Sequence, residues 1–385
     1  MYDGLYAALD PTLLPEILVD IEQRWRDARA AQDFQYIPNA NTFVAILNNT
    51  TARFPELQAR FRTPELTLTW MEACTGEANL KTGVWMKGVP CDFSGWIVGT
   101  NKQKVSVSTM VDTAFAVPLE VYDNMYTPAQ MFALAMMKAE KLVLEKWNQK
   151  AIAQLISYAG YNKYQMGLGV DGGTGPTSWK ITDVPFKNLN PQTFNAYVRM
   201  LGRMNKFVNP DLITGGALEV SEYVPGSLER FQFGNLNVYS DIESFPELGL
   251  ELDMFLLARG AVAFVNIFNH PINGASAAPI GPDQEIYFSM ALPSAYQVNG
   301  QPIMLDVTRK RIKKAIAQER FPDYITDNRC EWYDEYNVEL KGEIMLNPLS
   351  CSDTGTGVLR IHADTDLPPV LSPTTIHQYY DISNA

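Results

Sequence analysis

Two motifs come nearest to a catalytic or binding signature. Residues 167–172 satisfy the GxGxxG spacing, which holds a pyrophosphate when a strand precedes it and a helix follows it. A predicted helix precedes this motif instead, and more glycine follows, so we interpret it as a loop. Gly274–Ala278 approaches the nucleophile elbow of hydrolases but lacks its last glycine. It too is predicted to be a surface loop.

The histidines and acidic residues do not follow the spacing of a known metal-binding or catalytic motif. The three histidines, His270, His362 and His377, have no cysteine or carboxylate at the distances typical of metal ligands. Two acidic groups could act as acid and base or hold a cation, but neither has a glycosidase or EF-hand signature. They are Asp364 with Asp366, and Glu331 with Asp334 and Glu335. The sequence therefore predicts no catalytic residue, no cofactor and no metal.

A dense basic run occupies Arg309–Lys314, in a segment that could be helical through Glu319. It could bind a polyanion, or it could be a solvated or intersubunit face opposite the acidic surface of a neighbour. The net charge of −12 favours the second interpretation. Its role stays open at this point.

Composition predicts a folded, soluble protein. The chain has 385 residues, 46% hydrophobic and 19% charged, without an apolar run long enough to span a membrane. We expect no secretion signal at Met1–Gly4. Four cysteines without a CxxC pair are typical of free thiols in a reducing cytosol: Cys74, Cys91, Cys330 and Cys351.

Hydrophobic periodicity divides the chain into helical and extended parts. Residues 11–31 have helical spacing, and Leu66–Val121 contains short β-prone runs separated by glycines, typical of long hairpins. The strongest element is a helix over Pro128–Ala159, capped by Thr127 and ended by Gly160. Its apolar face includes Trp147, and its length is about 48 Å.

The second half mixes a helix with strands, so the predicted class is α+β. Asn190 caps a second amphipathic helix that begins at Pro191 and stops before Asn209. Strands are predicted at Asp211–Thr214, Asn235–Tyr239, Ala261–Ile267, Glu285–Met290 and Tyr336–Leu346.

This order of elements resembles the major capsid proteins of tailed bacteriophages, the Hong Kong ninety-seven type fold. The residues that carry the resemblance are Leu66–Val121, Thr127–Gly160 with Trp147–Leu155, Phe194–Thr214 and Phe233–Asp241. The resemblance implies an N-terminal arm, an extended β-hairpin loop, a long spine helix with a β-sheet, and a mixed α/β axial domain. The implied divisions are an arm with a helix (1–62), a hairpin loop (63–110), a peripheral domain with spine helix 127–160 (111–187), an axial domain (188–330) and C-terminal strands that return to the peripheral domain (331–385).

Exposed aromatic residues independently favour an assembly protein. A glycine-rich hairpin region cannot bury its own aromatic side chains, and the helix near the N-terminus has an apolar stripe with no obvious local cover. We therefore expect interface roles for Trp25, Trp85, Met86, Phe93 and Trp96. The expected structural spine residues are Thr127, Pro128, Trp147 and Gly160.

The predicted function is a structural subunit that assembles into an icosahedral shell around a phage genome. The resemblance implies hexamers and pentamers of the chain itself, with scaffolding, portal and decoration proteins as further partners, and double-stranded DNA enclosed without sequence-specific binding. The implied location is the virion capsid, assembled in the cytoplasm of the host bacterium. Two alternatives are an encapsulin-like compartment shell and a cytosolic carbohydrate-active enzyme that uses Trp70, Trp85 and Trp96 as a platform.

Overall fold

The described part of the computed structural model has two large sheets joined by one long helix, and two small two-stranded sheets. The residues that it describes are 14–31, 33, 35–50, 65–71, 100–106, 109–118, 128–160, 181–185, 191–207, 209–215, 230–233, 236–241, 243–250, 252–269, 286–298, 300–315, 330–346 and 356–364. Within this part of the chain, none of the helices is long and apolar enough to cross a bilayer.

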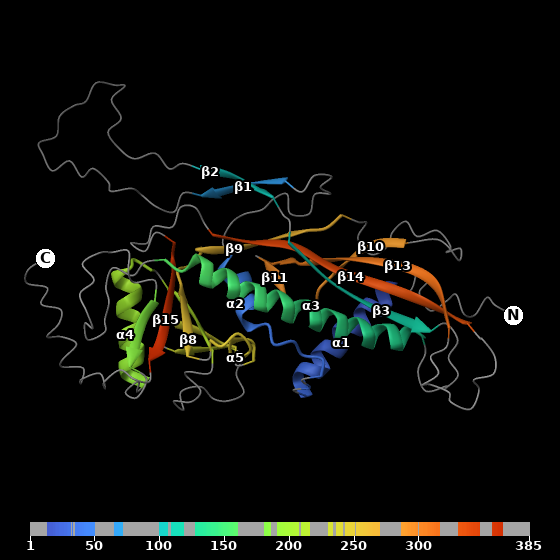
Figure 1. Ribbon diagram of the computed structural model, residues 1–385, viewed down its shortest axis with the longest axis horizontal. Coiled ribbons are helices and arrows are strands. Elements are labelled where there is room, and N and C mark those ends of the chain that lie inside the picture. The colour runs from blue at the N-terminus through green and yellow to red at the C-terminus, as the bar shows by residue number, and fades with distance from the viewer. Residues whose placement is uncertain are drawn as a thin grey trace, which may run out of the picture.

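The predicted long helix is confirmed as α3, which spans Pro128–Tyr158 and runs along the long axis of the molecule (Figure 1). Its predicted apolar face is buried, including Phe132 and Trp147. The Trp147 ring packs against Phe43 and Phe264, with ring centroids 5.9 and 5.2 Å away. After the helix, the Gly160 amide donates to the carbonyl of Val358 at 2.9 Å. Thr127, the expected cap, lies outside the described residues.

An antiparallel sheet packs against α3. Its order is β10 (Ile286–Ala291), β13 (Met304–Ala315), β14 (Cys330–Leu346) and β3 (Thr109–Pro118), and β9 (Val262–Ile267) pairs with the end of β14. The register places Arg309, Tyr336 and Phe115 side by side on three strands. Tyr336 and Phe115 meet Phe132 of α3 with centroids 4.8 and 5.9 Å apart. The inner face of this sheet therefore forms the core with α3.

Helix α2 (Asn41–Asn49) was not predicted, because its apolar run Phe43–Leu47 lies in an Asn- and Pro-rich stretch. It is buried between α3 and β9, and polar side chains fix it there. Asn148 of α3 accepts a hydrogen bond from the Phe43 amide at 2.9 Å. The Asn148 amide donates to Asp241 at 2.5 Å, and Thr42 donates to the same carboxylate at 2.7 Å.

The second sheet lies at the end of the molecule that carries α4 (Figure 1). Its order is β4 (Ile181–Pro185), β15 (Val358–Asp364), β8 (Asp253–Leu257), β5 (Asp211–Thr214), β7 (Leu236–Ser240) and β6 (Arg230–Phe233). Helix α4 (Pro191–Met204) begins at the predicted proline, and the short α5 (Ser244–Glu247) follows β7. Arg360 of β15 makes two hydrogen bonds to Asp253 of β8, at 2.8 and 3.1 Å.

The predicted domain divisions do not hold at two places. Strands β9, β10 and β13, expected in the axial domain, belong to the sheet on α3. The C-terminal strands divide between the sheets, because β14 pairs with β3 whereas β15 pairs with β4 and β8. Division by sequence order assigned these strands wrongly, because a chain can leave a sheet and return to it many residues later.

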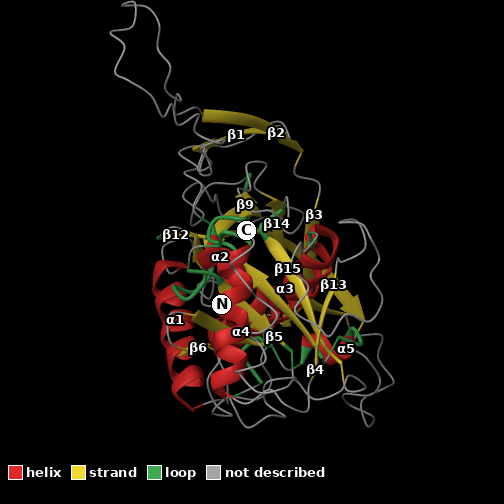
Figure 2. Ribbon diagram, turned by 90° about the vertical axis from the view of Figure 1, so that its left-hand side faces the viewer, coloured by secondary structure: helices red, strands yellow, loops and turns green. Residues whose placement is uncertain are grey.

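One helix and two pairs of strands lie outside these layers or at their edges. Helix α1 spans Leu14–Ala31, close to the predicted 11–31, and packs on α3. Strands β1 (Glu65–Met71) and β2 (Thr100–Ser106) form a ribbon that stands off from the body (Figures 1 and 2). Strands β11 (Gln297–Val298) and β12 (Gln301–Pro302) form a small hairpin whose Gly300 has a positive φ of 78°.

Candidate functional surfaces

The inner face of α1 is covered by its own chain. Ile17, Ile21, Trp25 and Ala28 are all buried, and the Trp25 indole donates to Glu140 of α3 at 2.7 Å. Its ring also packs edge-on against Tyr296, at a centroid distance of 6.2 Å. The prediction that this stripe lacks local cover is therefore wrong, and Trp25 is not available to a neighbour. The partner that covers it lies 115 residues away in sequence, so periodicity alone could not indicate it.

Glu140 is a buried carboxyl group with incomplete hydrogen bonding. Its Oε1 atom has no hydrogen-bond partner among the described residues, whereas Oε2 accepts the bond from Trp25. Burial raises the pKa of Glu140 to about 8, the bond from Trp25 lowers it in part, and the charge of Glu22 raises it further. The contact between α1 and α3 therefore includes a group that is protonated at neutral pH.

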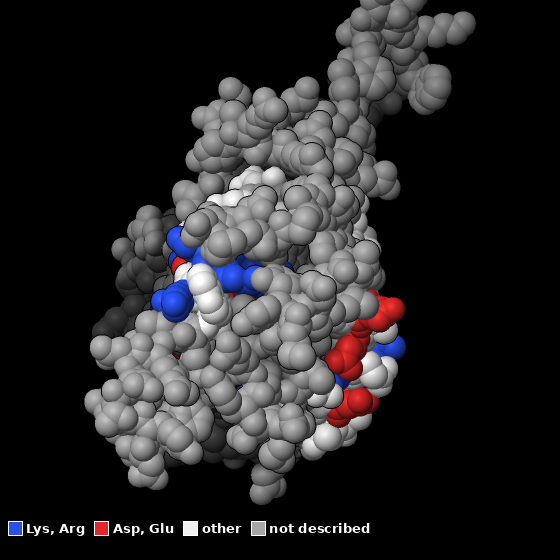
Figure 3. All heavy atoms as spheres, turned by 90° about the vertical axis from the view of Figure 1, so that its right-hand side faces the viewer, with Lys and Arg blue, Asp and Glu red and all other residues white. Residues whose placement is uncertain are grey.

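The outer face of α1 carries acidic side chains, the exposed arginines Arg26 and Arg29, and an exposed apolar residue. Glu16, Asp20 and Asp27 are exposed, and Val19 is 70% exposed. Asp20 accepts a hydrogen bond from Arg24 at 2.8 Å, a solvent-exposed pair one turn apart. Figure 3 shows acidic side chains along one side of the molecule with basic side chains among them, and a separate basic cluster.

The basic run Arg309–Lys314 lies on β13, so the expectation of a helix there is wrong. Pairing with β14 along the whole run sends alternate residues to opposite faces. Arg309 and Arg311 are buried, and their Nε atoms each donate to Asp334 at 3.0 Å. Lys310, on the opposite face, is exposed. Lys313 shares the face of the two arginines but lies near the end of β13 and is exposed, with its ammonium 5.7 Å from the centre of the Trp332 ring. Part of the predicted basic surface is thus an internal ion pair.

The outer face of the sheet on α3 is open along β3. Met110 is 46% exposed, and Asp112, Ala114 and Ala116 on the same face are exposed as well. Within the described part of the chain, β3 pairs with β14 on one side and with no strand on the other. Tyr287 of β10 is 44% exposed. A long unpaired edge of this kind can receive a strand or loop from another molecule.

The β1–β2 ribbon is the part of the predicted hairpin region that the structure describes. Seven residue pairs join the two strands, from Glu65 with Ser106 to Met71 with Thr100. The four expected interface residues of this region, Trp85, Met86, Phe93 and Trp96, lie outside the described residues. Their interface role stays a prediction.

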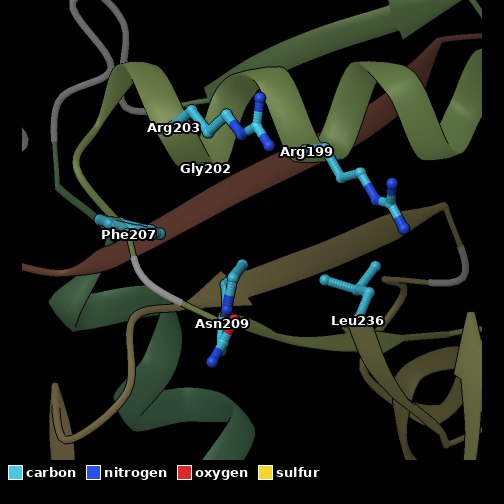
Figure 4. Close-up of a pocket in the computed structure, with 7 residues that line it drawn as sticks. Arg199, Gly202, Arg203, Phe207, Asn209 and Leu236 are labelled. Atoms are coloured by element: carbon cyan, nitrogen blue, oxygen red, sulfur yellow. The ribbon is translucent and has the colours of Figure 1, made fainter. Parts of the chain in front are cut away.

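A groove lies between α4 and the start of β7 (Figure 4). Its volume is about 290 Å³. Arg199 and Arg203 lie one helical turn apart on its rim and are exposed, whereas Phe207 and Leu236 are buried beneath. Sequence analysis missed this site, because two arginines four residues apart are common on any exposed helix.

The residues considered for enzyme chemistry are scattered or undescribed. His362 lies on β15 with Nδ1 3.5 Å from Asp253, which Arg360 already binds. Asp334 accepts hydrogen bonds from Arg309 and Arg311. The side chain of Glu331 is not among those that the structure describes. The motifs at 167–172 and 274–278, with His270, His377 and Asp366, lie outside the described residues. Among the residues that are described, no three His, Cys, Asp or Glu side chains gather as metal ligands.

Comparison with known proteins gives structural neighbours only. No protein-family model and no curated protein matches the sequence. The cyanophage A-1(L) capsid asymmetric unit is similar at 11% identity and a TM-score of 0.45, covering 86% of this chain and 94% of that one. A structure of mycobacterium phage Adephagia has 11% identity, a TM-score of 0.40 and coverages of 83% and 93%. A virus-like particle from Pyrococcus furiosus has 9% identity, a TM-score of 0.34 and coverages of 84% and 97%.

Proposed function

We propose that this protein is the major capsid protein of a tailed bacteriophage, a structural subunit that assembles with its own copies into an icosahedral shell. The observation that carries the proposal is the β1–β2 ribbon, which stands off from the body (Figures 1 and 2). An isolated two-stranded ribbon is marginally stable in water. Its length and position therefore favour a partner that covers it, and a neighbouring subunit is the simplest such partner.

The open sheet supports the same proposal. The edge of β3 extends over ten residues, with Met110 exposed on its outer face. Proteins that remain monomeric usually cover or shorten such an edge. On the opposite face, α3 provides a rigid support 31 residues long. A rigid body with uncovered strands is what we expect of a structural subunit that works by binding its neighbours in a fixed geometry.

The proposed assembly contains hexamers and pentamers of this chain and encloses double-stranded DNA without reading its sequence. Scaffolding, portal and decoration proteins are its proposed further partners. The proposed location is the virion capsid, after assembly in the cytoplasm of the host bacterium. In this role the ribbon region lies over a neighbouring subunit, and α3 acts as the spine.

A double substitution in the hairpin region tests the proposal. We expect W85S/W96S to give a folded protein that does not assemble, because an interface would lose two large aromatic side chains. Light scattering and electron microscopy of the purified wild type and variant would measure this. The matched control is W85F/W96F, which keeps aromatic side chains at both positions and should still assemble.

Other outcomes would favour a different function. A wild type that stays monomeric at every concentration and salt, with or without scaffolding protein, would overturn the proposal. If W85S/W96S kept the mass of the wild type but lost affinity for a sugar, the carbohydrate-active enzyme would be favoured instead. Shells that enclose protein and no DNA in their native cell would favour a compartment shell.

A further inference from the structure

The groove beside α4 combines an apolar floor with a basic rim. Phe207 is 5% and Leu236 is 2% exposed, whereas Arg199, Arg203 and Asn209 are exposed around them. Figure 4 shows both arginines projecting from α4, with Asn209 and Leu236 across the hollow. A ligand for this groove would need an apolar part and acidic groups about one helical turn apart.

The floor of the groove is shaped by close packing at Gly202. A Cβ atom at this position would lie 3.4 Å from Pro210 and 3.8 Å from Phe207. Residues 205–207 then turn away from the helix, because the Phe207 amide donates to the Gly202 carbonyl at 2.7 Å. This turn resembles a Schellman motif, with Lys206 in the left-handed region at φ 60°. The hollow is therefore built by a defined helix end and is not a gap between loose segments.

The guanidinium groups of the two arginines can bind an anion from another molecule. No described carboxylate lies within ion-pair distance of Arg199 or Arg203. Guanidinium groups bind carboxylates through paired hydrogen bonds, and exposed ones keep that capacity. With 43 acidic against 31 basic residues, a second copy of the chain is a ready source of carboxylates.

The outer face of α1 matches the groove in chemistry and spacing. Glu16 and Asp20 lie one helical turn apart, as Arg199 and Arg203 do. Asp20 also accepts a hydrogen bond from Arg24, which an incoming arginine would share or replace. Val19 lies beside them and is 70% exposed, the most exposed large apolar residue among those described. The opposite face of α1 is already buried, so the outer face, where Glu16 and Asp20 lie, is the one left for a partner.

We infer that the groove beside α4 binds the outer face of α1 from a second copy of this chain, with Arg199 and Arg203 facing Glu16 and Asp20. The two surfaces are well separated along the molecule, with α4 at one end and α1 under the other half (Figure 1). A contact between two different surfaces is head-to-tail, and its repetition builds a ring or an extended array. The inference rests on the proposed function and names one of its contacts.

A charge exchange tests this contact. We expect R199E/R203E to reduce the yield of closed shells at least 10-fold, and E16R/D20R to do the same, because each variant places like charges opposite each other. All four substitutions together should restore assembly to within a factor of about three of the wild type. Thermal unfolding of each purified subunit would confirm that it remains folded. K138E/K146E makes the same change in charge on exposed positions of α3 and should assemble like the wild type.

A cysteine pair provides a second, direct measurement. In V19C/R203C, mild oxidation of assembled shells should join copies into a ladder of covalent oligomers on a denaturing gel. Neither V19C nor R203C alone should give this ladder.

The outcomes separate this inference from the proposed function. A wild type that never assembles contradicts both. A wild type that assembles, while the combined charge exchange fails to restore shells and the cysteine pair gives no ladder, overturns the inference alone. The inference also fails if R199E/R203E shells form at normal yield and lose only their affinity for DNA.

Discussion

At the scale of single residues, the contact between Trp25 and Glu140 makes the stability of the subunit depend on pH. The folded protein holds the Glu140 proton with a pKa of about 8, against 4.5 for an unperturbed glutamate. Because the folded state binds this proton more tightly, its contribution to the free energy of unfolding is complete below pH 4.5 and falls as the pH rises to about 8. Above pH 8 both states are ionised, and the contribution is constant.

We predict that E140Q removes this dependence. The glutamine can still accept the hydrogen bond from Trp25, and it carries no ionisable proton. The wild type should therefore lose stability relative to E140Q as the pH rises from 5 to 8, so the unfolding free energy of E140Q minus that of the wild type should increase. Denaturant unfolding at several pH values would measure it, with E16Q on the exposed face of α1 as the control. Parallel pH profiles for E140Q and the wild type would contradict the assignment.

Trp147 is the second residue with a sharp expectation, because it is 1% exposed and lies between two other aromatic rings. We predict that W147A lowers the free energy of unfolding by about 3–5 kcal/mol, through lost burial and a residual cavity. W147F should lower the free energy of unfolding by less, since it keeps an aromatic ring in the core. Its remaining cost includes the loss of the 3.3 Å hydrogen bond that the indole donates to the Leu340 carbonyl. Equal, small losses in the two variants would mean that the cavity collapses without cost.

At the scale of elements, periodicity predicted the helices and most strands, because each signal is local. The 3.6-residue pattern and a proline at the first turn placed α3 within two residues of its observed ends. The same reasoning placed α4. These elements carry their information in residues three or four positions apart, which a sequence displays directly.

The misassigned elements depend on partners that are distant in sequence. The run Arg309–Lys314 has helix-forming residues, yet it is a strand because β14 pairs with it along its whole length and β10 pairs with β13 as far as Arg309. Helix α2 is stable because Asn148 and Asp241 satisfy its polar groups from more than 100 residues away. The groove at Arg199 depends in the same way on Leu236 of another element. Local propensity is overridden in each case by tertiary contacts.

The end of α4 gives a prediction about one element. Lys206 has a φ of 60°, a left-handed backbone conformation that is unfavourable for residues with a Cβ atom but not for glycine. We predict that K206G is more stable to unfolding than K206A by about 1 kcal/mol. Comparison with alanine separates the backbone effect from loss of the lysine side chain. Equal midpoints in thermal unfolding would show that the left-handed residue costs nothing here.

At the scale of the whole molecule, β14 and α3 hold the described parts together. β14 pairs with β13, β3 and β9 along its 17 residues. At Gly342, where β3 and β9 both pair with this strand, a Cβ atom would lie 2.5 Å from the Phe264 ring. On the other side of α3, α1 closes the core through Trp25. The helix near the N-terminus is therefore part of the subunit and cannot be treated only as an external arm.

This role changes the expected effect of removing residues 1–35. A purely external arm could be deleted without loss of subunit stability, and assembly alone would fail. Because α1 covers α3, we predict that the truncated protein unfolds at a lower temperature and exposes apolar surface even as a monomer. Thermal unfolding and binding of a hydrophobic dye would measure the two effects. E16R/D20R is the matched comparison, since it alters the outer face of α1 and leaves Ile17, Ile21 and Trp25 in place. A truncated monomer as stable as the wild type would show that α1 contributes to assembly and not to the core.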